Sequence, residues 1–293
     1  MKKLALVLGG GGARGALQVG ALRAIAEAGL KPSLLAGASI GALNATYWAL
    51  HGLDRSAVDQ METVWRASGT ADLLPANYLW LSVRTLFNRP DSQIPHRMRD
   101  FLIAHGITPE LTFAQIPGVQ LLLVTADLNH GQPVLYGLDP HQSVLEGVLT
   151  SAALPPWVKP LEKDDRYLLD GGFISNLPIE AALEHGAEQI IALDLSDSRE
   201  APPDARGFGA FLSKTILTVE ARQAHLERSL AAARGVPVLY VNLLGDTHVP
   251  LWDFKTAPAL IEQGEAQMRR ALADWHPTPR PWWQKLFTSP GNA

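Results

Sequence analysis

Short apolar runs alternate with longer, helix-like stretches along this chain. Residues 4–8 form an all-apolar run that glycines follow at once, which is typical of a buried central strand. Similar runs predict further strands at 34–37, 119–126, 189–195 and 236–243. Stretches with few helix breakers predict helices between them, at 13–28, 40–50, 179–185 and 212–233. The alternation predicts an α/β fold with a mostly parallel sheet flanked by helices.

Two segments interrupt this alternation. Residues 75–95 bring large apolar side chains together between prolines, among them Leu79, Trp80, Leu86 and Phe87. They are interpreted either as one more core-packing helix or as a mobile apolar cover over a binding pocket. The end of the chain is rich in proline and tryptophan, so we expect one domain over 1–275 and a tail over 276–293.

Composition excludes several classes of protein. The chain has 293 residues, with 25 basic and 29 acidic side chains and a net charge of −4, so no global basic field favours nucleic acid. It has no cysteine, which excludes disulfides, thiolate catalysis and cysteine-bound metals. Its nine histidines are scattered without a metal-binding spacing, and we therefore predict no metal site.

The sequence carries no obvious membrane or secretion signal. No run reaches the roughly 18 apolar residues that a transmembrane helix needs. The first apolar run, at 4–8, is shorter than the roughly 7–15 residues of a signal-peptide core. We therefore expect a cytoplasmic protein.

A glycine-rich loop at 9–15 follows the first predicted strand, and Gly10, Gly12 and Gly15 fit the pattern GxGxxG. One interpretation is a dinucleotide phosphate cradle, but no carboxylate ends the second strand to bind a ribose. The other is an oxyanion hole, because consecutive glycines expose backbone N–H groups ahead of a helix N-terminus. Arg14 would reinforce the local field or hold the loop in place.

A candidate nucleophile follows the second predicted strand. Residues 37–41 fit GxSxG, and the small Gly37 and Gly41 allow the sharp strand-to-helix turn that presents a serine hydroxyl. Because the pattern lies between a strand and a helix, it predicts that Ser39 is a nucleophile.

Two kinds of base could activate that serine. An ordinary serine hydrolase uses a late histidine, and His225 and His248 stand late enough. Alternatively, an apolar run ends in Asp170, and Gly171 and Gly172 then turn the chain. An aspartate needs desolvation and a strong oxyanion hole to serve as a base for a hydroxyl.

The combination of motifs resembles the patatin-like phospholipase family, and its bacterial members most closely. The shared elements are GxGxxG at 10–15, GxSxG at 37–41 and Asp-Gly-Gly at 170–172, in this order. Residues 151–155 resemble the S-x-A-x-P segment of the family, and 170–178 its DGG-x-x-x-N-x-P segment. The resemblance implies a three-layer α/β/α fold.

The resemblance also implies a mechanism. Ser39 would attack an ester carbonyl with Asp170 as general base, and water would release the acyl-enzyme. Backbone N–H groups of Gly10, Gly11 and Gly12 would form the oxyanion hole. Neither a metal nor an organic cofactor is implied.

The implied substrates are acyl esters, either of lipids or of simple carboxylic acids. Pro155 and Trp157 lie where the acyl pocket is expected, and many relatives carry phenylalanine at the second position of the Trp157-Val158 pair. An acyltransferase using the same site and, less favoured, a nucleotide-binding protein are the alternatives.

The tail at 281–287 mixes aromatic residues with a lysine. It is interpreted as a transient membrane contact, as a segment folded onto the domain, or as a contact with a second subunit. No oligomeric state is predicted.

Overall fold

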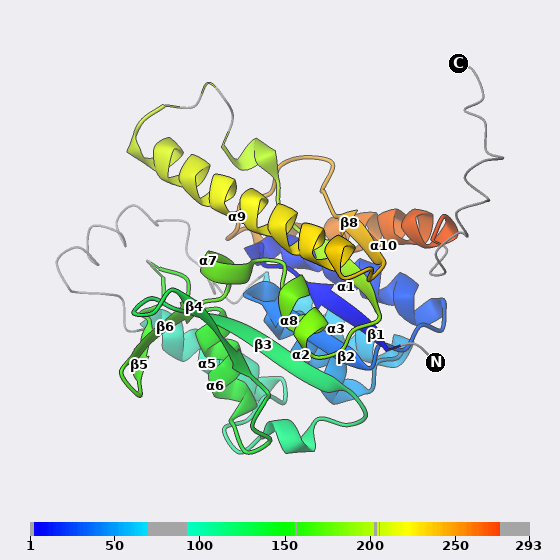
Figure 1. Cartoon of the computed structure of the whole chain (residues 1–293), viewed down its shortest axis with the longest axis horizontal. Helices are drawn as coiled ribbons and strands as arrows, with labels where there is room; N and C mark the ends of the chain where they lie inside the picture. Colours follow the sequence, from blue (N-terminus) through cyan, green and yellow to red (C-terminus); the bar gives the residue numbers. More distant parts are fainter. Residues whose placement is uncertain (1–2, 70–92, 156, 202–203, 205, 276–293) are drawn as a thin grey trace.

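The computed structural model describes residues 3–69, 93–155, 157–201, 204 and 206–275. These residues build one eight-stranded sheet in the order β5-β6-β3-β2-β1-β7-β8, with β4 paired to β3 (Figure 1). The pairings of β2–β3, β1–β2, β1–β7 and β7–β8 are parallel. The strands are β1 (Leu4–Leu8), β2 (Leu34–Ala38), β3 (Gln120–Asp127), β4 (Gln132–Tyr136), β5 (Leu161–Lys163), β6 (Arg166–Asp170), β7 (Gln189–Asp194) and β8 (Val238–Asn242).

Helices cover both faces of this sheet. They are α1 (Gly15–Glu27), α2 (Ile40–His51), α3 (Arg55–Ser68), α5 (Gln93–Ala104), α6 (Val144–Ser151), α7 (Gly172–Ser175), α8 (Ile179–Glu184), α9 (Phe208–Ala233) and α10 (Ala257–Ala273).

The strands explain why there are three layers. Successive side chains of a strand point to opposite faces, so an all-apolar strand needs cover on both sides. In β1, Leu6 and Leu8 pack into a core that includes α1, α2, α3 and α10. Ala5 and Val7 belong to a second core, on the side of α8 and α9. The predicted α/β architecture with a mostly parallel sheet is confirmed.

Strands β2 and β6 meet end to end along one edge of β3. Strand β2 pairs with β3 up to Ala38, which lies opposite Val124. The antiparallel β6 pairs with the next part of β3, and Asp170 lies opposite Thr125. Strand β4 occupies the other edge of β3 over the same residues. The carboxyl ends of β2 and β6 therefore arrive at the same place from opposite directions.

The C-terminal helix α10 packs closely on the first helix, α1 (Figure 1). A Cβ on Gly20 would lie 1.8 Å from the carbonyl oxygen of Ile261, and one on Gly264 would lie 1.9 Å from that of Leu17. Only glycine permits such an approach of two helix backbones. Early and late parts of the chain thus complete one core.

The predicted elements and the observed ones agree closely where the apolar pattern was local. Each predicted strand is present within two residues of its expected bounds, and the predicted helix at 13–28 is a 3-10 turn, η1 (Gly12–Arg14), followed by α1. The prolines and glycines at 199–209 predict a surface loop, but a 3-10 turn, η3 (Ser198–Glu200), and the start of α9 at Phe208 overlap this stretch. The segment containing Leu79, Trp80, Leu86 and Phe87 and the tail at 276–293 lie outside the described residues.

Candidate active site

Ser39 occupies a strained turn between β2 and α2. Its backbone has φ 53° and ψ −126°, a region that residues other than glycine rarely adopt. The predicted small neighbours permit the turn: a Cβ on Gly41 would lie 2.2 Å from the Leu8 carbonyl oxygen, and one on Gly37 would lie 2.6 Å from that of Gly41. The half-buried Ser39 is thus placed as the GxSxG pattern predicts.

Asp170 ends β6 and is only 2% exposed. Its Oδ1 accepts a hydrogen bond from the Gly172 N–H at 2.8 Å, while the buried Oδ2 has no well-aligned partner among the described residues. Burial raises the pKa of this carboxyl to about 6, and the Gly172 N–H and the Ser39 hydroxyl lower it in part. The structure therefore brings Ser39 and Asp170 together around one partly unsatisfied carboxylate.

Ser151 is a site residue that reasoning from the residues alone missed. Its hydroxyl donates to the Val124 carbonyl oxygen at 2.6 Å and accepts from the Ser39 N–H at 3.1 Å. A hydroxyl has a single proton, so donation to Val124 turns an oxygen lone pair toward Ser39. The only signal for this residue in the sequence was the S-x-A-x-P segment.

The same segment also contacts the other half of the site. The Ala153 carbonyl accepts from the Asp170 N–H at 3.1 Å, and the Ser151 carbonyl accepts from the Gly171 N–H at 3.3 Å. A Cβ on Gly171 would lie 2.2 Å from the Val124 carbonyl oxygen, so the turn after Asp170 packs directly on β3. Residues 151–153 thus hold both Ser39 and Asp170 by backbone and hydroxyl contacts.

The glycine loop lies against Ser39. A Cβ on Gly10 would be 3.0 Å from the Ser39 Cβ. The Gly10 N–H donates to the Asn176 carbonyl at 3.1 Å, whereas the N–H groups of Gly11 and Gly12 have no acceptor among the described residues. Two adjacent backbone donors are therefore free beside the candidate nucleophile. At the end of the loop, a Cβ on Gly15 would lie 2.5 Å from Ile40, which again requires a small residue.

Arg14 holds the loop by an ion pair. It is 5% exposed, and its Nη1 lies 2.8 Å from Glu200 Oε2. Burial and the charge of Glu200 raise the pKa of nearby Glu220, in α9, to about 8, while Arg14 lowers it. The ion pair holds the Arg14 side chain against Glu200, and both roles considered for Arg14 stay predictions.

Among the described residues, neither a histidine nor a metal-binding cluster forms part of this site. Within the described ranges, no histidine forms a hydrogen bond with Ser39 or Asp170. His225 is exposed on α9, and the buried Nε2 of His248 has no partner there. The part of the chain that the structure describes also holds no group of three or more His, Asp or Glu side chains placed to bind a metal ion.

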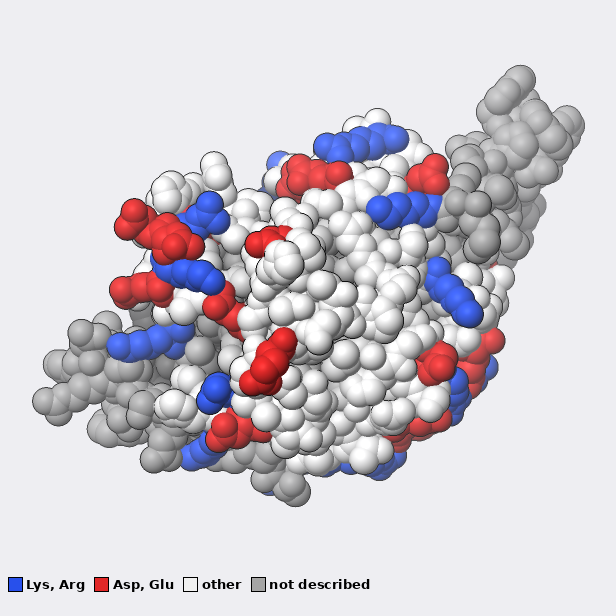
Figure 2. Space-filling model, turned by 90° about the horizontal axis from the view of Figure 1, so that it is seen from below, with Lys and Arg blue, Asp and Glu red and all other residues white. Residues whose placement is uncertain are grey.

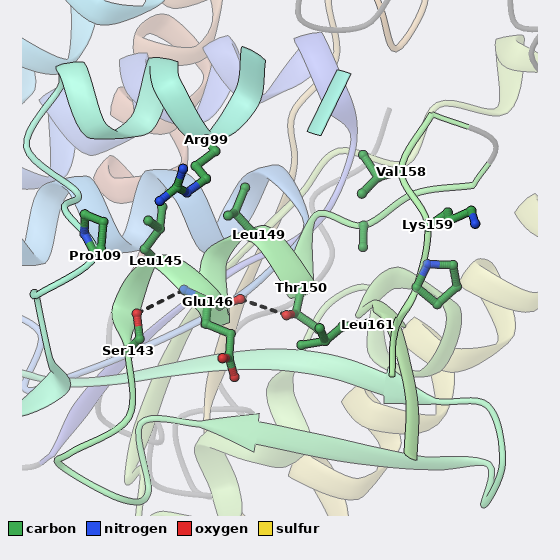
Figure 3. A pocket seen from close by; sticks show the side chains of 12 residues that line it. Arg99, Pro109, Ser143, Leu145, Glu146, Leu149, Thr150, Val158, Lys159 and Leu161 are labelled. Carbon is green, nitrogen blue, oxygen red and sulfur yellow. Dashed lines mark hydrogen bonds between the residues drawn. The ribbon is translucent and has the colours of Figure 1, made fainter. Parts of the chain in front are cut away.

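Apolar side chains gather beside the segment that holds the site. Trp157 is 6% exposed and packs with Leu154, Val158 and Trp252, next to the partly buried Pro155. Val158 also lines a cavity of about 350 Å³ between α5, α6 and β5. Figure 3 shows Arg99 of α5 at this cavity and Glu146 of α6 bonded to Ser143 and Thr150. The cavity borders a different face of α6 from the one that bears Ser151.

Charged side chains of one sign do not form a separate patch on the face drawn in Figure 2. Lysine and arginine side chains there are interspersed with aspartate and glutamate. Among the described residues, no helix combines the length and the apolar composition needed to cross a bilayer.

Comparison with known proteins places the site in context. A family model described as "Patatin-like phospholipase" matches residues 6–183, which contain Ser39, Ser151, Asp170 and the glycine loop at 9–15. Patatin-like phospholipase domain-containing protein 6 of Homo sapiens is 32% identical over 220 residues, or 72% of this chain and 14% of that protein. Lysophospholipase nte1 of Aspergillus terreus is 29% identical over 229 residues, or 74% of this chain and 13% of that protein. The crystal structure of VipD from Legionella pneumophila superposes with a TM-score of 0.49 and 15% identity, over 93% of this chain and 67% of that one.

The chain spans about one seventh of the length of the human and Aspergillus relatives.

Proposed function

Because the chain belongs to the patatin-like phospholipase family, we propose that it hydrolyses acyl esters of lipids, with Ser39 as nucleophile and Asp170 as general base. The observation that carries the proposal is the meeting of β2 and β6 on one edge of β3. It sets a strained serine beside a single buried carboxylate. Each group is fixed by the sheet itself and does not depend on a loop.

The two side chains suffice for an acyl-transfer cycle. As the Ser39 Oγ bonds to the ester carbonyl carbon, Asp170 takes the hydroxyl proton, and the carbonyl oxygen becomes an oxyanion. The tetrahedral intermediate then breaks its bond to the alcohol, which receives the proton from Asp170. Water attacks the acyl-enzyme in the same way, with Asp170 as base, and releases the acid and free Ser39.

We assign the oxyanion hole to the N–H groups of Gly11 and Gly12. Three glycines were expected to contribute, but the Gly10 N–H is already engaged with the Asn176 carbonyl. Gly10 instead supplies the close approach of the loop to Ser39. Fixed backbone donors in a site of this kind are worth several kcal/mol because they need no reorganisation as charge develops.

The acyl chain is assigned to the apolar surface around Trp157. Pro155 and Trp157 directly follow the segment that contacts Ser39 and Asp170, and Trp157 is packed against Leu154 and Trp252. An aliphatic chain that packs against this surface is buried from water, which favours its binding. The single-domain expectation for 1–275 and the roles of the tail at 276–293 stay predictions.

The test of this function combines turnover with covalent labelling. Purified protein is given p-nitrophenyl esters from acetate to palmitate and lysophospholipids, and separately a fluorophosphonate that reacts with activated serines. We expect ester hydrolysis, and a single phosphonylated peptide that contains Ser39. A folded protein that neither hydrolyses any ester nor reacts with the fluorophosphonate would overturn the proposal.

The activity should depend on pH through Asp170. Only the ionised carboxylate can accept the Ser39 proton, and burial raises its pKa to about 6. We therefore expect kcat/KM for a soluble ester to rise with pH and to level off above an apparent pKa of about 6. Repeating the profile at several temperatures identifies the group, because the pKa of a carboxyl group barely changes with temperature and that of an imidazole falls on warming. A rate that is constant across this range would contradict the assignment.

Removing the Ser151 hydroxyl should slow the chemical step. In Ser151→Ala the Ser39 N–H loses its acceptor, so the strained turn can relax and misplace Oγ. We expect kcat to fall by about 10- to 100-fold with KM nearly unchanged, and Ser151→Thr, which keeps a hydroxyl, to recover much of the loss. Steady-state kinetics on one soluble ester measure both parameters.

A matched control separates positioning from general loosening of α6. Thr150 is 3% exposed, and its hydroxyl donates to the Glu146 carbonyl within the same helix at 2.8 Å. Thr150→Val removes that buried hydroxyl without touching Ser39. Equal losses in Ser151→Ala and Thr150→Val would show that Ser151 has no specific role.

A further inference from the structure

Exposed apolar side chains concentrate on α9 and on α7 beside it. Phe211, Val219 and Leu226 of α9 are 65%, 45% and 50% exposed, and Phe173 of α7 is 37% exposed. The three α9 positions are eight and seven residues apart, which is close to two helical turns each. They therefore share one side of the helix. We call these four residues the α9 face.

The α9 face adjoins the segment that follows Asp170. Gln223 of α9 donates to the Phe173 carbonyl at 2.9 Å. Glu227 of α9 accepts hydrogen bonds from the Ser175 hydroxyl and from the Glu180 N–H, so it ties α9 to the end of α7 and to the start of α8. Since α7 begins two residues after Asp170, a partner that contacts the α9 face at Phe173 lies close to the candidate active site.

Charge on α9 is divided between its two sides. Its two glutamates face the protein: Glu227 is 7% exposed, and Glu220 interacts with Glu200, Arg14 and Asp170. Arg222 is exposed and lies in sequence between Val219 and Leu226. The outward side thus combines apolar side chains with a cation and lacks a carboxylate. Such a surface is complementary to anionic lipid head groups above an acyl layer.

We propose that the α9 face docks on an anionic lipid surface. The apolar side chains enter the boundary between head groups and acyl chains, and Arg222 pairs with a lipid phosphate. Docking there brings the turn after Asp170 against the lipid, so that an ester can reach Ser39 without crossing bulk water. This last consequence rests on the proposed function, whereas the docking itself needs no hydrolysis.

The test uses the full chain with Phe211→Ser, Val219→Ser and Leu226→Ser combined. Binding is measured by co-sedimentation with vesicles of equal parts phosphatidylcholine and phosphatidylglycerol. We expect wild type to bind and the triple variant to bind at least about tenfold more weakly, since the variant has no apolar side chains at these three positions to bury in the lipid. The variant should hydrolyse p-nitrophenyl butyrate as wild type does and lose hydrolysis of vesicle lipid.

Two comparisons make the result specific. Leu128 and Leu138 are 54% and 55% exposed but lie outside α7 and α9, so changing both to serine should leave vesicle binding unchanged. Arg222→Gln should weaken binding to the mixed vesicles and not to vesicles of phosphatidylcholine alone, because only the former carry net negative charge.

Each other outcome has a defined meaning. If the triple variant binds vesicles as strongly as the wild-type protein does, the inference is wrong. A triple variant that changes only self-association, measured by light scattering, would make the α9 face an interface between copies of the chain and would also overturn it. If wild type binds vesicles through the α9 face but hydrolyses no ester, the docking stands and the proposed function fails.

Discussion

Replacing Ser39 with alanine is expected to reduce ester hydrolysis by about 10⁴-fold or more, since removing a nucleophile eliminates the covalent route. The fold should survive, because alanine meets the same backbone strain as serine at φ 53° and the Ser39 N–H keeps its bond to Ser151. Initial rates on p-nitrophenyl butyrate measure the loss, and thermal unfolding shows that the variant is folded.

A control serine sharpens this prediction. Ser229, on α9, is exposed and donates only to the His225 carbonyl within its helix. Ser229→Ala should keep full activity and fluorophosphonate labelling, while Ser39→Ala should lose both. Labelling that persists in Ser39→Ala would show that another residue is the nucleophile.

Replacing Asp170 with asparagine is expected to reduce kcat by about 10³-fold, which is of the order seen when a general base is lost. The amide has nearly the shape of the carboxylate, and its oxygen can still accept the Gly172 N–H, but it cannot take a proton. The loss is measured as kcat on a soluble ester above the apparent pKa, where the wild-type base is ionised.

The same substitution should not destabilise the protein at neutral pH. Burial raises the folded-state pKa of Asp170 above its unfolded value, so the folded state binds the proton more tightly. Protonation of Asp170 therefore stabilises the folded state at low pH, and this stabilisation is lost as pH rises through about 6. It amounts to about 1.4 kcal/mol for each unit by which the folded-state pKa exceeds the unfolded-state pKa. Asparagine never ionises, so thermal unfolding of Asp170→Asn should occur at the wild-type temperature or higher above that pH.

A second buried aspartate provides the matched control. Asp194 is 2% exposed, ends β7 in the same sheet, and both of its carboxylate oxygens accept hydrogen bonds, from Ser196 and Tyr240. Asp194→Asn should cost far less activity than Asp170→Asn. If Asp170→Asn stays active while His225→Ala or His248→Ala does not, a histidine is the base and the assignment of Asp170 is wrong.

Features set by neighbouring residues could be predicted from the sequence. The strand at 4–8 is apolar throughout because both of its faces are buried, and the turn at Ser39 requires glycine two residues before and two after. The roles of Ser39 and Asp170 stay predictions, although the structure places the two side chains together.

Features that depend on tertiary packing could not be predicted in this way. Ser151 contacts Ser39 across 112 positions of sequence, only because α6 packs beside β3 and α2. The engagement of the Gly10 N–H with Asn176 likewise depends on where the chain returns after α7. Helices α3, α5 and α10 lie in stretches for which the apolar pattern suggested no element, since their exposed sides carry many charges.

The close packing of α10 on α1 has a consequence for synthesis of the chain. A ribosome makes α1 long before α10, so Gly20 of α1 meets its partner backbone only when Ile261 has been added. Until then the apolar side of α1 that α10 covers stays open to unintended association. The nascent α1 therefore needs shielding until α10 has been made.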